Sequence, residues 1–143
     1  MKISFGYPLI GGAEKNAVLK VLSGNILVHG PKAVEFENVF CKFTKSPFAV
    51  SVSSCTAGMH LVYFTLGIGT GDEVIVPSNT YIATWLAVTH AGATPIPVEP
   101  DPNTYNIDPN RIEAAITSKT RAIIAVHLYG QTCEMAPIMK LAN

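Results

Sequence analysis

Residues 48–60 combine an apolar strand pattern, a short polar turn and the start of a helical pattern. Phe48–Val52 is mostly apolar and rich in β-favouring residues. Apolar side chains then recur at helical spacing, at Ala57, Leu61 and Phe64. A strand that turns directly into a helix exposes unpaired backbone N–H groups and the positive end of the helix dipole. The turn Ser53–Thr56 could therefore bind a phosphate group, although the same residues are also ordinary helix caps.

Further strand and helix patterns alternate along the chain. We expect helices over residues 13–22, 32–43, 56–66, 80–90, 109–116 and 137–142, and strands over 48–53, 74–77, 94–98 and 121–128. This order predicts an α/β fold with a mostly parallel sheet flanked by helices. Two prolines in Thr94–Val98 predict an edge strand, whereas the apolar run Ala122–Val126 predicts a central strand buried on both faces. The segment Gly67–Gly71 follows a helix and precedes a strand, so we interpret it as a helix stop rather than a phosphate loop.

The composition excludes several classes of function. Ten basic and ten acidic side chains cancel without bunching, so we expect no nucleic-acid partner. The long uncharged spans are interrupted by polar residues, glycine and proline, so we expect no membrane segment and a cytoplasmic protein. Cys41, Cys55 and Cys133 are too widely spaced for a zinc site or a disulfide framework. Only 14% of residues are charged and 48% are hydrophobic, which suggests that much of the surface is covered by something else.

Several motifs together resemble one family. They are Ser53–Leu61, Gly67–Pro77, Asn79–Thr84, Asn103–Asp108, Ile112–Thr117 and Ala125–Gln131, with Gly30 and Glu35–Glu37 before them. Their order and spacing resemble the pyridoxal-phosphate-dependent sugar aminotransferases of the DegT/DnrJ/EryC1/StrS group. The resemblance implies an N-terminal helical segment over residues 1–45 and, over 46–143, part of the large domain of a fold-type I aminotransferase.

The resemblance also implies roles for particular residues. Ser54, Cys55 and Thr56 would hold the phosphate of pyridoxal 5'-phosphate, with Cys55 where the family usually has glycine. Tyr81 would stack on the pyridine ring, whereas the sequence without the resemblance favours an aromatic cap in a helix–sheet seam. His127 and Gln131 follow the last predicted strand and are candidates for a place near the site. Trp85 is expected in the core, and His60 and His90 on helix surfaces or in seams.

The implied reaction moves an amino group from an amino acid, expected to be glutamate, to a keto group of a nucleotide-linked deoxy sugar. Such enzymes are usually homodimers. The lysine that forms a Schiff base with the cofactor and the aspartate that pairs with its ring nitrogen would lie beyond Asn143. We therefore expect this chain to be an N-terminal piece, truncated before that lysine and inactive alone. The alternatives are a sugar 3-dehydratase of the same superfamily, with histidine replacing the lysine, and a non-catalytic assembly module.

The resemblance finally implies a strand order of 3-2-4-5-6-7-1 for the large domain. Only the first four strands fall within these residues. The second, third and fourth could pair with one another, and the first, over residues 48–53, would lack both neighbours.

Overall fold

The structure is a computed structural model, and it describes residues 6–143. The chain divides into two compact units, with the boundary between Ser51 and Val52. The division near residue 45 that the sequence predicts stays a prediction.

The N-terminal unit is built from two helices, α1 (Gly12–Leu22) and α2 (Pro31–Thr44), as predicted. A proline at the first position of α2, where a backbone N–H would be unpaired in any case, favours the start of that helix. The carboxylate of Glu37 on α2 accepts hydrogen bonds from both the backbone N–H and the hydroxyl of Ser51, each at 2.7 Å. This pair ties the end of the unit to its second helix. Neither helix contributes a fully buried side chain.

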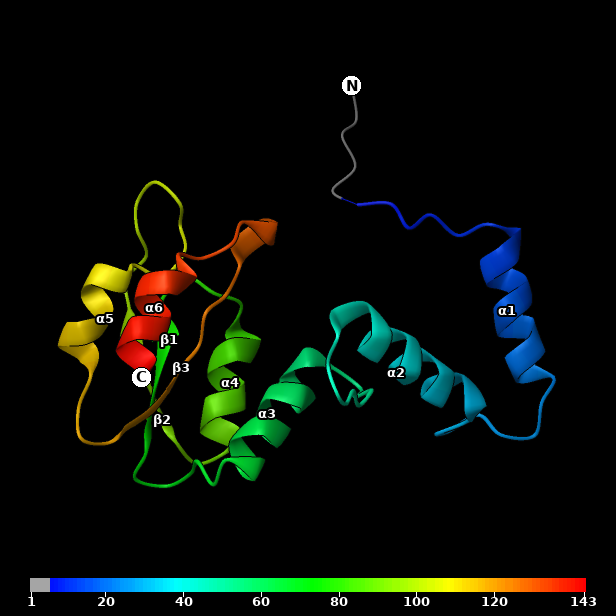
Figure 1. Ribbon diagram of the computed structural model, residues 1–143, viewed down its shortest axis with the longest axis horizontal. Coiled ribbons are helices and arrows are strands. Elements are labelled where there is room, and N and C mark those ends of the chain that lie inside the picture. The colour runs from blue at the N-terminus through cyan, green and yellow to red at the C-terminus, as the bar shows by residue number, and fades with distance from the viewer. Residues whose placement is uncertain (1–5) are drawn as a thin grey trace. The chain divides into compact units, whose positions relative to one another are not determined.

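The second unit is an α/β layer structure (Figure 1). Its elements follow in the order α3 (Cys55–Thr65), β1 (Glu73–Pro77), α4 (Ile82–His90), β2 (Thr94–Val98), α5 (Pro109–Ala115), β3 (Thr120–Ile123), the short 3-10 helix η1 (Leu128–Gly130) and α6 (Met135–Ala142). The three strands are parallel and lie in the order β2-β1-β3.

The central strand β1 separates two hydrophobic clusters. Val74 and Val76 point to one face, where they pack in a cluster with residues of α3 and α4. Ile75 points to the other face and packs with Ile112 of α5 and Ile138 of α6. Because side chains alternate along a strand, this one element supplies both cores, and helices cover both faces of the sheet (Figure 1).

Local signals predicted most elements correctly. The proline-bearing strand β2 is at the edge of the sheet, paired only with β1. Asp108 caps α5 by accepting the backbone N–H of Asn110 at 2.9 Å, and Pro109 is the first helical residue. The segment after α3 is a helix stop, since Gly67 has a φ of +67° and the N–H of Ile68 returns to the carbonyl of Tyr63.

Two predictions about strands were wrong. Residues 48–53 form no strand, and Phe48 and Val50 are exposed. A strand requires a neighbour for its backbone groups, and the segment has none. The last strand, β3, ends at Ile123 instead of continuing to residue 128, and it lies at the edge of the three-stranded sheet. Its residues are half-buried at most, since no strand pairs with its outer side.

Candidate functional site

The predicted site residues gather at the carboxyl edge of the sheet. Parallel strands end at the same edge, which is where ligands bind in sheets of this kind. The helix α3 leads through a short turn into the start of β1, and α4 follows directly after its end. Both helices therefore run against the strand direction, and their N-termini lie at the carboxyl edge (Figure 1).

The N-terminus of α3 offers two free backbone donors. Ser54 is the N-cap, and its hydroxyl accepts the N–H of Ala57 at 3.1 Å. Its carbonyl accepts the N–H of Gly58 at 3.0 Å. Among residues 6–143, no acceptor pairs with the N–H groups of Cys55 and Thr56. The first turn also carries no acidic side chain, so the positive end of the helix dipole is not neutralised from within the helix.

The cysteine in this turn keeps the backbone available as a donor. Cys55 is exposed and is the first residue of α3. Its φ is not in the left-handed region, which among the described non-glycine residues is occupied only by His29, Lys45, Tyr105 and Tyr129. The turn therefore has no need for glycine at this position, and a side chain here imposes no backbone strain.

Tyr81 presents its ring at the same edge. It is the N-cap of α4, and 79% of its surface is exposed. The chain leaving β1 is fixed by the N–H of Ser78, which donates to the carbonyl of Val98 at 2.8 Å. The hydroxyls of Thr80 and Thr84 are hydrogen-bonded at 2.8 Å across the first turn of α4. An aromatic cap packed in a helix–sheet seam would be buried, whereas this ring is open to a ligand.

The segment after β3 is held by hydrogen bonds to two side chains, those of His127 and Asn106. The sequence singled out His127 but not Asn106. His127 accepts the backbone N–H of Cys133 on Nδ1 at 3.1 Å. The side chain of Asn106 is bonded to the backbone of both Leu128 and Gln131. Asn106 lies within a motif that carried the family resemblance, but nothing in its local sequence indicates that its side chain is buried.

The remaining candidates lie elsewhere. Trp85 is half-buried and packs against the cluster between the sheet and α3 and α4, as predicted. The rings of His60 and His90 meet edge to face at 6.5 Å on the exposed surface of the same helices. Residues 6–143 contain no group of histidine, cysteine and acidic side chains that could hold a metal ion.

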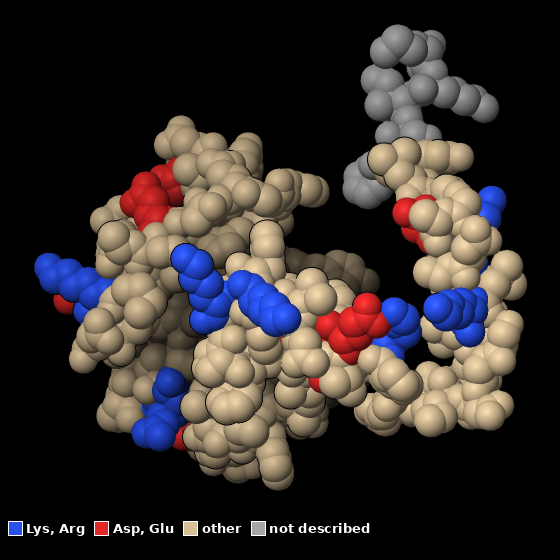
Figure 2. All heavy atoms as spheres, turned by 45° about the vertical axis from the view of Figure 1, so that its right-hand side comes forward, with Lys and Arg blue, Asp and Glu red and all other residues tan. Residues whose placement is uncertain are grey.

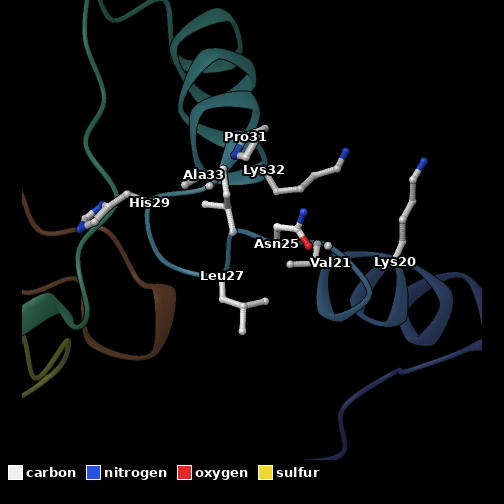
Figure 3. Close-up of a pocket in the computed structure, with 11 residues that line it drawn as sticks. Lys20, Val21, Asn25, Leu27, His29, Pro31, Lys32 and Ala33 are labelled. Atoms are coloured by element: carbon white, nitrogen blue, oxygen red, sulfur yellow. The ribbon is translucent and has the colours of Figure 1, made fainter.

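One groove of the structure includes a predicted site residue, and a second pocket lies in the N-terminal unit. An apolar groove of about 560 Å³ lies between α3 and the outer side of β3 and begins at Cys55. In the N-terminal unit, a separate pocket of about 380 Å³ is formed by the loop between α1 and α2. Figure 3 shows the ammonium groups of Lys20 and Lys32 on one side of that loop and His29 on the other. None of the four residues predicted to bind the cofactor lines this second pocket.

The charge distribution agrees with the composition. On the face that Figure 2 shows, lysine, arginine and acidic side chains are scattered over a mostly uncharged surface. No helix within residues 6–143 is both long enough and apolar enough to span a membrane.

Comparison with protein families gives one match over almost the whole chain. Residues 8–143 match the model of the DegT/DnrJ/EryC1/StrS aminotransferase family. The chain belongs to this family. The predicted resemblance is thereby confirmed.

Individual members of the DegT/DnrJ/EryC1/StrS family are also similar. GDP-perosamine synthase of Caulobacter vibrioides is 44% identical over 99% of this chain and 38% of its own length. The dTDP-3-amino-3,6-dideoxy-alpha-D-galactopyranose transaminase of Aneurinibacillus thermoaerophilus is 46% identical over 90% of this chain and 36% of its own. Among solved structures, NtdA from Bacillus subtilis with bound cofactor PMP has a TM-score of 0.86 and 38% identity, over 90% of this chain and 30% of its own. The α/β fold predicted from the sequence is thus confirmed as that of this family, and the chain spans between 30% and 38% of the length of these relatives.

Proposed function

We propose that the protein carrying this chain is a pyridoxal-5'-phosphate-dependent aminotransferase that acts on a nucleotide-linked keto sugar. Family membership supports the aminotransferase class. Two relatives named for GDP- and dTDP-linked amino sugars support the substrate class. The observation that carries the proposal is the pair of unpaired N–H groups at Cys55 and Thr56, at the edge of the sheet where Tyr81 exposes its ring.

The chemistry of these donors fits the cofactor's phosphate. Two backbone N–H groups and the dipole of an 11-residue helix attract an anion, and the Thr56 hydroxyl can add a third donor. No carboxylate of the first turn competes for the position. We infer that Ser54, Cys55 and Thr56 hold the phosphate and that Tyr81 stacks on the pyridine ring. When bound, the cofactor supplies an electron sink for the carbanion that forms as a proton leaves the amino-bearing carbon.

This chain's own residues then contribute binding and orientation. The helix N-terminus fixes one end of the cofactor, and the Tyr81 ring restricts rotation of the other. Ser54 stabilises the helix end by accepting the N–H of Ala57, and its own O–H remains available as a donor to the phosphate. We expect the proton-transferring lysine and the ring-nitrogen aspartate to come from outside these 143 residues.

Further proposals concern the whole protein. We infer that residues 46–143 belong to the large domain and that more strands extend the sheet beyond the open side of β3, where the apolar groove lies. Residues 1–45 form the helical segment that precedes it. We expect a homodimer in the cytoplasm, with glutamate as the amino donor. The many exposed apolar side chains of the two N-terminal helices are consistent with coverage by another part of the assembly.

The test uses the full-length protein loaded with pyridoxal 5'-phosphate. Borohydride reduction followed by intact mass measurement is expected to show one covalent cofactor per chain, and incubation with glutamate and a keto-sugar nucleotide is expected to give 2-oxoglutarate and an amino sugar. Thr56→Val is expected to weaken cofactor binding roughly fivefold through loss of one hydrogen bond. Thr65→Val, the same change at the other end of α3, is the matched control. A dehydrated sugar without amino transfer, or no bound cofactor, would overturn the proposal.

A further inference from the structure

The buried side chain of Asn106 joins two points of one loop. Only 4% of Asn106 is exposed. Its carboxamide oxygen accepts the backbone N–H of Leu128 at 3.0 Å, and its NH₂ group donates to the carbonyl of Gln131 at 2.9 Å. These partners lie 22 and 25 residues further along the chain. The side chain of Asn106 is therefore hydrogen-bonded to both ends of the turn that contains η1.

The backbone of Asn106 is itself held in place by hydrogen bonds within its turn. The backbone N–H of Asn106 donates to the hydroxyl of Thr104, and its carbonyl accepts the N–H of Asp101 at 2.9 Å. The carboxylate of Asp101 accepts two further backbone N–H groups in the same turn. The next residue, Ile107, is 1% exposed and packs in the core with Ile75. Asn106 therefore projects from a rigid turn that is anchored in the core.

Two further hydrogen bonds join Cys133 to the residues that precede the same loop. The N–H of Cys133 donates to Nδ1 of His127 at 3.1 Å, and the thiol of Cys133 donates to the carbonyl of Val126 at 3.1 Å. At the tip, Tyr129 has a φ of 52° and is 94% exposed. A left-handed tyrosine persists only where its surroundings hold it, and such strain is concentrated at functional sites. The loop from His127 to Gln131 is thus ordered by side chains around an exposed aromatic tip.

The loop lies beside the predicted cofactor site. Ile75 of β1 pairs with Ile123 of β3, and the N–H of Ile124 donates to the carbonyl of Ile75 at 2.9 Å. The strand β3 ends at Ile123, and the chain continues from this carboxyl end to His127. Neighbouring strands are about 4.8 Å apart. The loop after β3 and the segment from β1 to Tyr81 therefore both start at the carboxyl edge of two neighbouring strands.

We propose that Asn106 is a positioning residue for the cofactor site. It touches no ligand itself. It fixes the loop Leu128–Gln131 at the carboxyl edge of the sheet, so that the loop is already ordered when the cofactor binds at this edge. This inference rests on the proposed function, and it adds a residue that acts through two backbone groups of another segment.

The first experiment compares cofactor affinity in the full-length protein. Asn106→Asp keeps the size of the side chain and the acceptor for Leu128, but it places an oxygen against the carbonyl of Gln131. The probe is pyridoxamine 5'-phosphate, which binds without a covalent bond to lysine. We expect its Kd to rise about tenfold, as for loss of a buried hydrogen bond. Asn16→Asp, the same change at an exposed position of α1, is expected to leave the Kd unchanged.

A second measurement separates positioning from folding. Amide hydrogen exchange of the unmodified protein is expected to slow at residues 128–131 when pyridoxamine 5'-phosphate binds, and kcat of Asn106→Asp at saturating cofactor is expected to fall less than its affinity. Failure of the unmodified protein to bind the probe would overturn the proposed function together with this inference. Normal binding by Asn106→Asp, or unchanged exchange at the loop, would overturn the inference alone.

Discussion

Ser54 and Ala57 are joined by a hydrogen bond of 3.1 Å from the backbone N–H of Ala57 to the hydroxyl of Ser54. This bond satisfies the third N–H of α3 and leaves those of Cys55 and Thr56 free. An aspartate cap would have brought a negative charge to the helix end. The neutral cap therefore stabilises the helix while preserving its positive end for an anion.

Replacing the cap tests its contribution to stability. Ser54→Ala is expected to lower the free energy of unfolding by about 1 kcal/mol, because the N–H of Ala57 loses its acceptor. Urea denaturation followed by circular dichroism would measure this loss. Ser53→Ala, one residue outside the cap, is expected to have little effect. Equal losses in the two variants would show that the hydroxyl of Ser54 does not act as a cap.

The identity of residue 55 is expected to matter little for phosphate binding. Cys55→Gly introduces the residue usual in the family and leaves the backbone N–H in place. We expect the Kd for pyridoxamine 5'-phosphate to stay within about threefold, because the donor is the backbone. The free energy of unfolding is expected to fall by about 0.5–1 kcal/mol, because glycine is a poorer helix former. A large gain or loss in affinity would indicate that the thiol takes part in binding.

Tyr81 can be removed without disturbing the core. Its ring is 79% exposed, so Tyr81→Ala is expected to leave the unfolding midpoint of the cofactor-free protein unchanged. The Kd for pyridoxamine 5'-phosphate is expected to rise roughly two- to tenfold, as for loss of one aromatic stacking contact. Tyr81→Phe keeps the ring and should retain the affinity. Tyr7→Ala, the same truncation at another exposed tyrosine, is the control. Unaltered binding by Tyr81→Ala would exclude the stacking role.

Elements that depend on local signals were predictable from the sequence. Prolines in Thr94–Val98 remove donors from one strand and so require an edge position, which β2 occupies. Asp108 followed by Pro109 specifies a helix start by side-chain capping and a preset φ, and α5 begins there. In each case the residues that decide the structure are neighbours in the sequence.

Features that depend on distant partners were not predictable. The apolar pattern of Phe48–Val52 suits a strand, and only the strand order that the resemblance implied indicated that its neighbours would be missing. The local pattern alone therefore predicted a strand where the described residues form none. The same limit applies to β3, which was expected to be a central strand but pairs only with β1 among the described residues and is half-buried at most. Asn106 is the clearest example at the site, since its burial and both partners depend on a loop more than 20 residues away.

The pair of Glu37 and Ser51 gives a prediction about pH. Hydrogen bonds from the backbone N–H of Ser51, and then from its hydroxyl, hold the pKa of Glu37 below its ordinary value of 4.5. Because the folded pKa is below the unfolded one, the ionised carboxylate favours the folded arrangement. This stabilisation is complete above the unfolded pKa and is lost as the pH falls through the folded pKa. The segment ending at Ser51 is therefore expected to loosen from α2 on acidification.

Nuclear magnetic resonance titration of the Glu37 carboxyl carbon would measure this shift directly. Ser51→Ala removes the hydroxyl but keeps the backbone N–H, so the pKa of Glu37 is expected to rise part of the way to its ordinary value. Ser46→Ala, in the same segment but without a hydrogen bond to Glu37, should leave that pKa unchanged. Glu37→Gln should abolish the acid-induced loosening, since its side chain does not titrate. A Glu37 pKa at its ordinary value in the unmodified protein would contradict the proposed cause, because two short hydrogen bonds to a carboxylate must favour the ionised form.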